Sequence, residues 1–418
     1  MTAQTDGFDR NSSPQHKKPG AEHAQAALPD LYRHVRARSV ELIDGLSDAD
    51  ATVQSMPDAS PAKWHLAHTS WFFEIMVLHR FVADYAPFDP RFDYLFNSYY
   101  DSVGERHPRP ARGLLSRPTL DEVLTYRGHV DAAMAQLLRG AIPPQALALI
   151  ELGCHHEQQH QELLLTDILH LFAANPLRPA YRAAAAPLPA SDAAPLRFAS
   201  IDGGMVEIGA DGTGFSFDAE GPRHTTFIEP FDLATRLVTN REWQDFIEDG
   251  GYEDPRLWLS DGWAMARAQN WRAPLYWEQR EGQMLVMTLE GMQLLQPDAP
   301  VSHVSYYEAD AFASWSGMRL PSEFEWELAA GTVKLDQMFG AVWQWTRSAF
   351  APYPRFRASS EAVGEYNGKF MSGQYVLRGS SLATPEGHSR PSYRNFFPPH
   401  ARWQFTGLRL TRDGQGPI

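Results

Sequence analysis

Apolar side chains recur with helical period along the first half of the chain, and this pattern predicts a bundle of long helices. One stripe follows Pro29 and contains Leu31, Val35, Leu42 and Leu46. A second follows Ser60 and Pro61, an expected N-cap and first helical residue, and contains Trp64, His68, Trp71, Ile75 and Leu78. A third helix is predicted over about 119–138, and a fourth after Pro143 and Pro144. Four amphipathic helices favour a four-helix bundle.

The second half of the chain has a different pattern. Short strand-like runs alternate with glycine-containing turns, and ten of the twelve tryptophans lie beyond residue 240. Helical segments stand out at about 306–315 and 323–330. This half is therefore predicted to be an irregular, loop-rich α+β domain.

Composition shifts divide the chain into four predicted segments. Residues 1–26 are polar and are expected to form a disordered tail, followed by the bundle over 27–173. Residues 174–198 are rich in Ala and Pro, which is typical of a linker, and the second domain is expected over 199–413. Inside the bundle, an aromatic and arginine-rich loop is predicted over 87–118. Loops of this length in a compact domain are usually functional.

Charge and cysteine content narrow the possible binding partners and the expected cellular compartment. A formal net charge of -14 over 418 residues argues against a broad basic face for nucleic acid. Cys154 is the single cysteine, which excludes a disulfide framework and favours a reducing compartment. The sequence contains neither a membrane-length apolar run nor a charged-then-apolar leader. We therefore predict a cytoplasmic protein that binds neither nucleic acid nor membrane.

Two histidines on the fourth predicted helix are candidate metal ligands. His156 and His160 are four residues apart, so both imidazoles leave the same face of a helix, at positions where core residues are expected. His68, on the apolar stripe of the second helix, is the best candidate for a third ligand. Imidazole ligands suit Zn, Cu, Fe or Ni, so ligand type leaves the metal open. Hydrogen-bonded core histidines are the alternative.

The segment from His156 to His160 also matches the zinc-protease pattern H-E-x-x-H, in which Glu157 would be the general base. Such enzymes commonly take a third ligand downstream. No glutamate occurs between Glu162 and Glu207, and no glycine turn follows that would bring His170 back to the pair. The protease interpretation is therefore disfavoured.

Longer motifs resemble a known two-domain family. The bundle carries HLAHTSWFFE at 65–74 and HEQQHQE at 156–162, and the second half carries RLPSEFEWELAA at 319–330, AVWQWT at 341–346, LRGSS at 377–381 and FTGLRL at 405–410. Together they resemble the EgtB-type sulfoxide synthases of ergothioneine biosynthesis, over about 28–412. In that family a DinB-like four-helix bundle is fused to a C-type-lectin-like domain of the formylglycine-generating-enzyme type. Formylglycine synthesis itself is excluded, because it uses cysteines in that domain and this chain has none after Cys154.

The resemblance implies an iron enzyme. His68, His156 and His160 would bind Fe(II), and the enzyme would use O2 to join the sulfur of cysteine, or of γ-glutamylcysteine, to imidazole C2 of hercynine as a sulfoxide. Iron is expected over zinc because chemistry with O2 needs a redox-active centre. Cysteine is favoured as the thiol donor, since the branch of the family that carries the motif FNSYY, here at 96–100, is associated with it.

The resemblance also implies roles for residues around the metal. Gln159 would hydrogen-bond the hercynine imidazole, and Glu162 would orient a metal ligand. Tyr99 and Tyr100, in the FNSYY motif, are the candidate catalytic residues and would supply a proton, or an electron and a proton. Candidates for binding the substrates' carboxylates or the trimethylammonium group of hercynine are Arg106, Arg109, Arg112, Arg394, Asn395 and Phe396.

Neighbouring functions remain open at this level. A selenoneine synthase would join a selenosugar to hercynine with the same architecture, whereas a 5-histidylcysteine sulfoxide synthase usually carries an extra methyltransferase domain, which is absent here. The DinB-like bundle alone could instead belong to a metal-dependent thiol transferase or a non-catalytic binding module. Strict dependence of turnover on Fe(II) and O2 separates the synthase from these last two.

Overall fold

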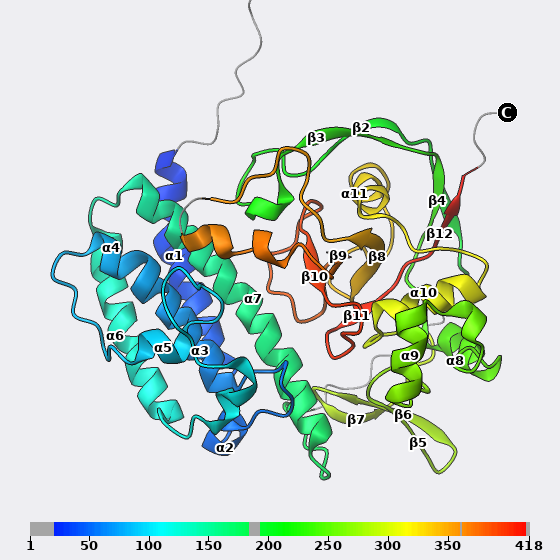
Figure 1. Cartoon of the computed structure of the whole chain (residues 1–418), viewed down its shortest axis with the longest axis horizontal. Helices are drawn as coiled ribbons and strands as arrows, with labels where there is room; N and C mark the ends of the chain where they lie inside the picture. Colours follow the sequence, from blue (N-terminus) through cyan, green and yellow to red (C-terminus); the bar gives the residue numbers. More distant parts are fainter. Residues whose placement is uncertain (1–20, 184–192, 360–361, 415–418) are drawn as a thin grey trace, which may run out of the picture.

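The computed structural model describes residues 21–183, 193–359 and 362–414, and shows a helical bundle beside a larger mixed domain (Figure 1). Most of the tail expected over 1–26 lies outside the described residues. The helices of the first half are α1 (Ala21–Glu41), α2 (Asp48–Thr52), α3 (Ala62–Phe73), α4 (His79–Phe81), α5 (Phe92–Phe96), α6 (Leu120–Arg139) and α7 (Pro144–Ala174). A π-helical turn, Glu74–Leu78, joins α3 to α4, and a 3-10 helix spans Arg109–Leu114.

The four long helices of the bundle confirm the pattern read from the sequence, with two differences at their starts. Helix α1 begins at Ala21 and contains Pro29, because buried Leu28 extends the apolar stripe upstream of the proline. Helix α3 has Pro61 as its N-cap, with no side-chain cap, so the expected capping by Ser60 is wrong. Helix α6 starts as predicted, because Thr119 and Glu122 form a reciprocal capping box.

The second domain is a set of small sheets with short helices around them. The strands are β1 (Phe198–Ile201), β2 (Gly204–Ile208), β3 (His224–Ile228), β4 (Phe231–Ala234), β5 (Trp277–Arg280), β6 (Gln283–Thr288), β7 (Gly291–Leu294), β8 (Trp343–Ala349), β9 (Tyr375–Gly379), β10 (Asn395–Phe397), β11 (Thr406–Gly407) and β12 (Thr411–Asp413). The sheets have the orders β1-β4-β12, β10-β9-β8-β11, β2-β3 and β5-β6-β7. The helices are α8 (Asn240–Glu248), α9 (Ser260–Ala268), α10 (Tyr306–Trp315) and α11 (Glu323–Thr332), and the 3-10 helices are Asp218–Glu220, Pro255–Leu257, Ala362–Glu365 and Gly368–Phe370.

Helix α7 packs between the bundle and the second domain (Figure 1). Its buried Glu162 joins the two halves, because its carboxylate accepts hydrogen bonds from Trp343 Nε1 at 2.7 Å, Thr384 Oγ1 at 2.8 Å and the Ser381 hydroxyl. Burial raises the pKa of this carboxyl group. The expectation that Glu162 orients a metal ligand is therefore replaced by a role in fastening α7 to the sheet that contains β8.

Candidate metal centre

Three histidines from two helices converge between the bundle and the second domain. Helix α3 supplies His68, and helix α7 supplies His156 and His160 one turn apart. One ring nitrogen of each can be chosen so that all three lie within 4.8 Å of one another. The ring centroids of the three pairs are 4.6, 4.7 and 5.0 Å apart. The structure therefore brings together the three ligands predicted from the sequence.

The surroundings of these rings favour neutral imidazoles with free nitrogens. Burial lowers the pKa of His156 to about 3 and lowers the pKa values of His68 and His160 well below the usual range, with the neighbouring histidines adding to the effect at the latter two. His68 donates Nδ1–H to the carbonyl of Phe96 at 2.6 Å, which leaves its buried Nε2 without a hydrogen-bond partner. Both ring nitrogens of His156 are likewise buried and unpartnered. Unpaired buried nitrogens are costly, and a bound divalent metal ion would satisfy one nitrogen of each ring.

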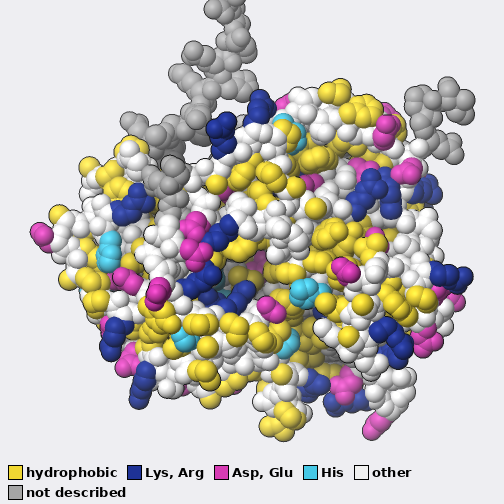
Figure 2. Space-filling model, viewed as in Figure 1, with side chains coloured by type: hydrophobic (Ala, Val, Ile, Leu, Met, Phe, Trp, Pro, Cys, Tyr) yellow, Lys and Arg dark blue, Asp and Glu magenta, His cyan; other side chains and the backbone are white. Residues whose placement is uncertain are grey.

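The histidine cluster opens onto a cavity of about 640 Å³ between the two domains. The cavity wall combines polar groups of the bundle with aromatic side chains of the second domain. In the view of Figure 2, Lys and Arg side chains gather beside a hollow near the middle of the molecule. The predicted site residues that line the cavity are Tyr99, Arg106, Arg109, Arg112, His156, Gln159, His160, Glu162, Asn395 and Phe396.

Arg112 is the arginine whose environment is most unusual. Its guanidinium is buried and stacks on Trp64, with Cζ 3.3 Å from the ring centroid. It donates to the hydroxyls of Ser60 at 2.8 Å and Ser98 at 3.4 Å, but among the described residues no carboxylate pairs with it. Burial and nearby Arg109 lower its pKa. A buried guanidinium without a counter-ion at a cavity wall is suited to bind a ligand carboxylate.

Three predicted residues do not line the cavity: Arg394, Tyr100 and the metal-ligand candidate His68, which is fully buried. Arg394 lies behind the cavity wall, where its guanidinium bonds Glu323 through Nε at 2.8 Å and Nη2 at 2.9 Å and stacks on Tyr353. Its remaining donors reach backbone carbonyl groups, so the structure assigns Arg394 to the internal packing of the second domain. Tyr100 is fully buried and stacks behind Tyr99, with ring centroids 4.6 Å apart.

Gln159 is held by two tyrosines that the sequence analysis did not identify. Its Nε2 donates to the Tyr393 hydroxyl at 2.6 Å, and the Tyr366 hydroxyl donates to its Oε1. Tyr366 also packs edge-on against His156, with ring centroids 5.6 Å apart. No motif spacing links residues more than 200 positions apart, so the sequence offered no signal for this contact. The amide of Gln159 is thus oriented from the second domain.

The loop that carries Tyr99 is fixed by the same domain. Glu365 accepts hydrogen bonds from the backbone N–H groups of Asp101 at 3.1 Å and Ser102 at 2.8 Å. Lys369 donates to the Tyr99 carbonyl, and the Tyr99 ring packs edge-on against Phe370 at 5.1 Å. The tyrosine of the bundle is therefore held at the cavity by contacts from the second domain.

The geometry disfavours the zinc-protease interpretation. Glu157, which would be the general base, lies on the opposite side of α7 from the cavity. There its carboxylate pairs with Arg36 at 3.0 Å, and it also pairs with Arg127 and the hydroxyl of Ser39. A carboxylate occupied by two buried guanidinium groups cannot activate a water molecule at the metal. In addition, the third histidine lies upstream of the pair, on α3.

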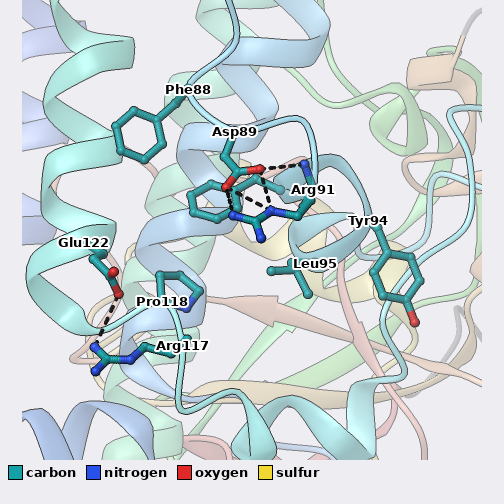
Figure 3. Close-up of a pocket in the computed structure, with 9 residues that line it drawn as sticks. Phe88, Asp89, Arg91, Tyr94, Leu95, Arg117, Pro118 and Glu122 are labelled. Atoms are coloured by element: carbon teal, nitrogen blue, oxygen red, sulfur yellow. Dashed lines mark hydrogen bonds and ion pairs between the residues drawn. The ribbon is translucent and has the colours of Figure 1, made fainter.

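A second cavity, of about 620 Å³, lies in the bundle beside α5 and α6 (Figure 3). Its wall includes Phe88, Phe92 and Leu95. The charged groups at its edge pair with each other, Asp89 with Arg91 at 2.9 Å and Arg117 with Glu122 at 3.7 Å. None of the predicted site residues lines it. It therefore lacks the unpaired polar groups that mark the cavity at the histidines.

Both halves of the chain match known domain families. Residues 31–164 match the DinB superfamily, and residues 186–334 and 332–414 match the sulfatase-modifying factor enzyme 1-like domain. A formylglycine-generating enzyme of Thermomonospora curvata is 33% identical over 152 residues, which cover 31% of this chain and 47% of that protein. No helix in the described part of the chain is long and apolar enough to cross a membrane.

Two relatives align along nearly their whole length. Hercynine oxygenase of Mycobacterium tuberculosis is 31% identical over 426 residues, covering 90% of this chain and 96% of that protein. Hercynine oxygenase of Mycolicibacterium smegmatis is 30% identical over 442 residues, covering 93% and 99%. The chain therefore belongs to the hercynine oxygenase (EgtB-type) family, in which a DinB-like bundle is fused to a formylglycine-generating-enzyme-like domain.

Proposed function

We propose that this protein is a hercynylcysteine S-oxide synthase of ergothioneine biosynthesis that depends on Fe(II) and O2. The reaction breaks the C2–H bond of hercynine and the S–H bond of the thiol, and forms a C–S bond and an S–O bond. One oxygen atom of O2 enters the sulfoxide and the other leaves as water. The observation that carries this proposal is the buried cluster of three histidines at a cavity that both domains build.

His68, His156 and His160 would hold the iron, and bound Fe(II) would supply open coordination positions and the redox chemistry with O2. Three neutral imidazoles fit this role, because burial disfavours the charged form of each of the three rings. The reducing cytoplasm that we propose as its location is compatible with a chain whose single cysteine, Cys154, is free and buried.

The cavity wall offers a place for each end of the substrates. Arg112, with exposed Arg109 beside it, would bind the carboxylate of the thiol substrate. The aromatic faces contributed by the second domain would receive the trimethylammonium group of hercynine by cation–π contact, at about 0.5–2 kcal/mol. Gln159, oriented by its two tyrosines, would hydrogen-bond the imidazole.

Tyr99 is the tyrosine that we assign to proton transfer. Its ring lies at the cavity wall, whereas Tyr100 is behind it and supports its position by stacking. Burial raises the pKa of the Tyr99 hydroxyl, so this group keeps its proton at neutral pH and can donate it during the reaction.

The test is turnover of purified protein reconstituted anaerobically with Fe(II) and then mixed with O2, hercynine and one thiol donor. We expect sulfoxide with cysteine, less with γ-glutamylcysteine, and none without iron or O2; a selenosugar serves as the competing donor. His160→Ala should lose iron and turnover while it remains folded. His170→Gln is the control, because His170 lies on the same helix as His160 and bonds Ser55. Full sulfoxide synthesis by the His160 variant would refute the ligand assignment.

A further inference from the structure

A hydrogen-bond chain runs from His160 through His65, which also lines the cavity, to Asp167. Nδ1 of His160 lies 2.8 Å from Nδ1 of His65, and Nε2 of His65 lies 3.0 Å from Oδ2 of Asp167. The same carboxylate oxygen accepts the backbone N–H of Ser60 at 2.8 Å. His65 and Asp167 are 3% and 7% exposed, so water does not compete effectively for these bonds.

With a neutral His65 and an ionised Asp167, the hydrogen-bond chain has one consistent arrangement of protons. A carboxylate accepts hydrogen bonds and does not donate them, so His65 must donate its Nε2–H to Asp167. Neutral His65 then has an unprotonated Nδ1, which must accept a hydrogen bond from Nδ1–H of His160. His160 is left with an unprotonated Nε2. That is the tautomer in which this nitrogen can bind a metal ion.

We propose that His65 and Asp167 are positioning residues for the metal centre, which fix the ring of His160 with its proton on Nδ1 and its Nε2 free for the metal. The inference rests on the metal centre of the proposed function and extends it beyond the three ligands. Each residue comes from a helix that also supplies ligands, since His65 precedes His68 by three residues on α3 and Asp167 follows His160 by seven on α7.

The Asp167–His65 pair provides for His160 what the Phe96 carbonyl provides for His68. Both partners accept the Nδ1 proton of a ligand, but only His160 is linked to a full negative charge. A carboxylate acting through an intervening imidazole increases the electron density on the ligand nitrogen. Loss of such partners typically lowers metal affinity about 10–100-fold.

The experiment measures Co(II) binding to the metal-free full-length protein, by the visible absorption of the bound ion, together with the thermal unfolding of each variant. Asp167→Asn keeps an acceptor for His65 but removes the charge. His65→Phe removes both ring nitrogens, whereas His65→Asn keeps a polar group near the position of Nδ1. His170→Gln is the matched control, because His170 bonds Ser55 and does not touch the ligands.

We expect Asp167→Asn and His65→Phe to weaken Co(II) binding about 10–100-fold, with a changed absorption band. His65→Asn should recover part of the affinity, and His170→Gln should match the wild type. If the variants lose thermal stability but keep wild-type affinity and spectrum, the pair is only structural and the proposal is overturned. If the wild-type protein itself fails to bind Co(II) or Fe(II), the metal centre of the proposed function is refuted, and the two failures are thus distinguished. Because Asp167→Asn preserves side-chain size and His65→Asn keeps a polar side chain that is smaller than histidine, a folding failure of His65→Phe leaves the test intact.

Discussion

At the scale of single residues, the most informative side chain outside the histidines is Arg112. Burying a guanidinium without a carboxylate partner is costly, and stacking on Trp64 with two hydroxyl contacts offsets only part of that cost. Most other buried arginines of this protein pair with carboxylates, as Arg378 does with Glu323 and Glu327. Buried Arg409 has no carboxylate partner, but its guanidinium donates to a side-chain amide oxygen and two backbone carbonyl groups. Arg112 instead lies at the cavity with its Nε unpartnered, and a substrate carboxylate would complete its pairing there.

Replacement of Arg112 should therefore weaken binding of the thiol substrate. We expect Arg112→Gln to raise the KM for cysteine about 10–100-fold, the equivalent of about 1.4–3 kcal/mol lost with one charge-assisted pair. The KM for hercynine should change less. Steady-state kinetics with each substrate varied in turn measures both values. Arg91→Gln, which breaks an exposed pair with Asp89 at the second cavity, is the matched control. Equal effects on the two KM values would contradict the assignment.

Tyr99 and Tyr100 give a second prediction at this scale. We expect Tyr99→Phe to keep iron, because no ligand is lost, and to divert turnover from sulfoxide toward simple thiol oxidation by at least about 10-fold in product ratio, since a positioned acid typically contributes 10²–10⁴-fold. Tyr100→Phe should change the ratio less. Chromatography of sulfoxide and disulfide products measures both. Unchanged ratios in the two variants would exclude these tyrosines from the mechanism.

At the scale of elements, the helical period of apolar residues predicted the long helices of the bundle. Local sequence preferences failed to predict a helix start where contacts distant in sequence determine it. The capping box at Thr119 is local, so the start of α6 was predictable. Ser60 looked like an N-cap, but in the fold its hydroxyl accepts from Arg112 and its backbone N–H donates to Asp167. Those partners are distant in sequence, so no local pattern could reveal them.

The residues of the candidate site show the same difference between local and long-range contacts. His156 and His160 share a helix face, and their spacing alone predicted that they lie together. Tyr366, Tyr393 and Asp167 act through contacts across helices or domains, which periodicity does not report. The prediction that Arg394 binds a substrate was wrong for a related reason, because a motif gives the position of a residue but not the direction of its side chain.

The junction between α7 and the sheet that contains β8 gives a prediction about stability. Glu162→Ala should leave the Trp343, Ser381 and Thr384 donors without their acceptor in a buried site. We expect a loss of about 2–4 kcal/mol in the free energy of unfolding, with a smaller loss for Glu162→Gln, which keeps one acceptor oxygen. Denaturant unfolding of the metal-free protein measures both. A change below about 0.5 kcal/mol in Glu162→Ala, the range of ordinary surface substitutions, would show that this carboxylate does not fasten the domains.

At the scale of the whole molecule, one domain supplies the metal ligands, whereas both domains build the cavity. The bundle alone supplies the three histidines, while the second domain supplies the aromatic wall and the groups that orient Gln159 and the Tyr99 loop. A fold associated with formylglycine synthesis thus serves here as a wall for a site whose reactive groups come from another domain. The aromatic wall can therefore change without the loss of a metal ligand.

The global stability of the molecule should depend on pH through His303, a buried histidine of the second domain remote in sequence from the metal ligands. Burial lowers its folded-state pKa to about 3, whereas in the unfolded chain it titrates near 6.5. Below about pH 6.5 the unfolded state therefore binds a proton that the folded state excludes, and stability is lost as the pH falls toward 3. His303→Asn removes this proton linkage, and asparagine tolerates the positive φ of 62° at this position.

Whatever packing His303→Asn loses should be the same at each pH, so the difference in unfolding free energy between variant and wild type isolates the proton effect. We expect this difference to shift in favour of the variant by about 2 kcal/mol between pH 7 and pH 5. Urea unfolding of both proteins, at matched ionic strength, measures it. Stability curves that run parallel over this interval would mean that His303 becomes protonated in the folded protein, and its neighbours Tyr276 and Phe405 would then have to make room for a hydrated charge.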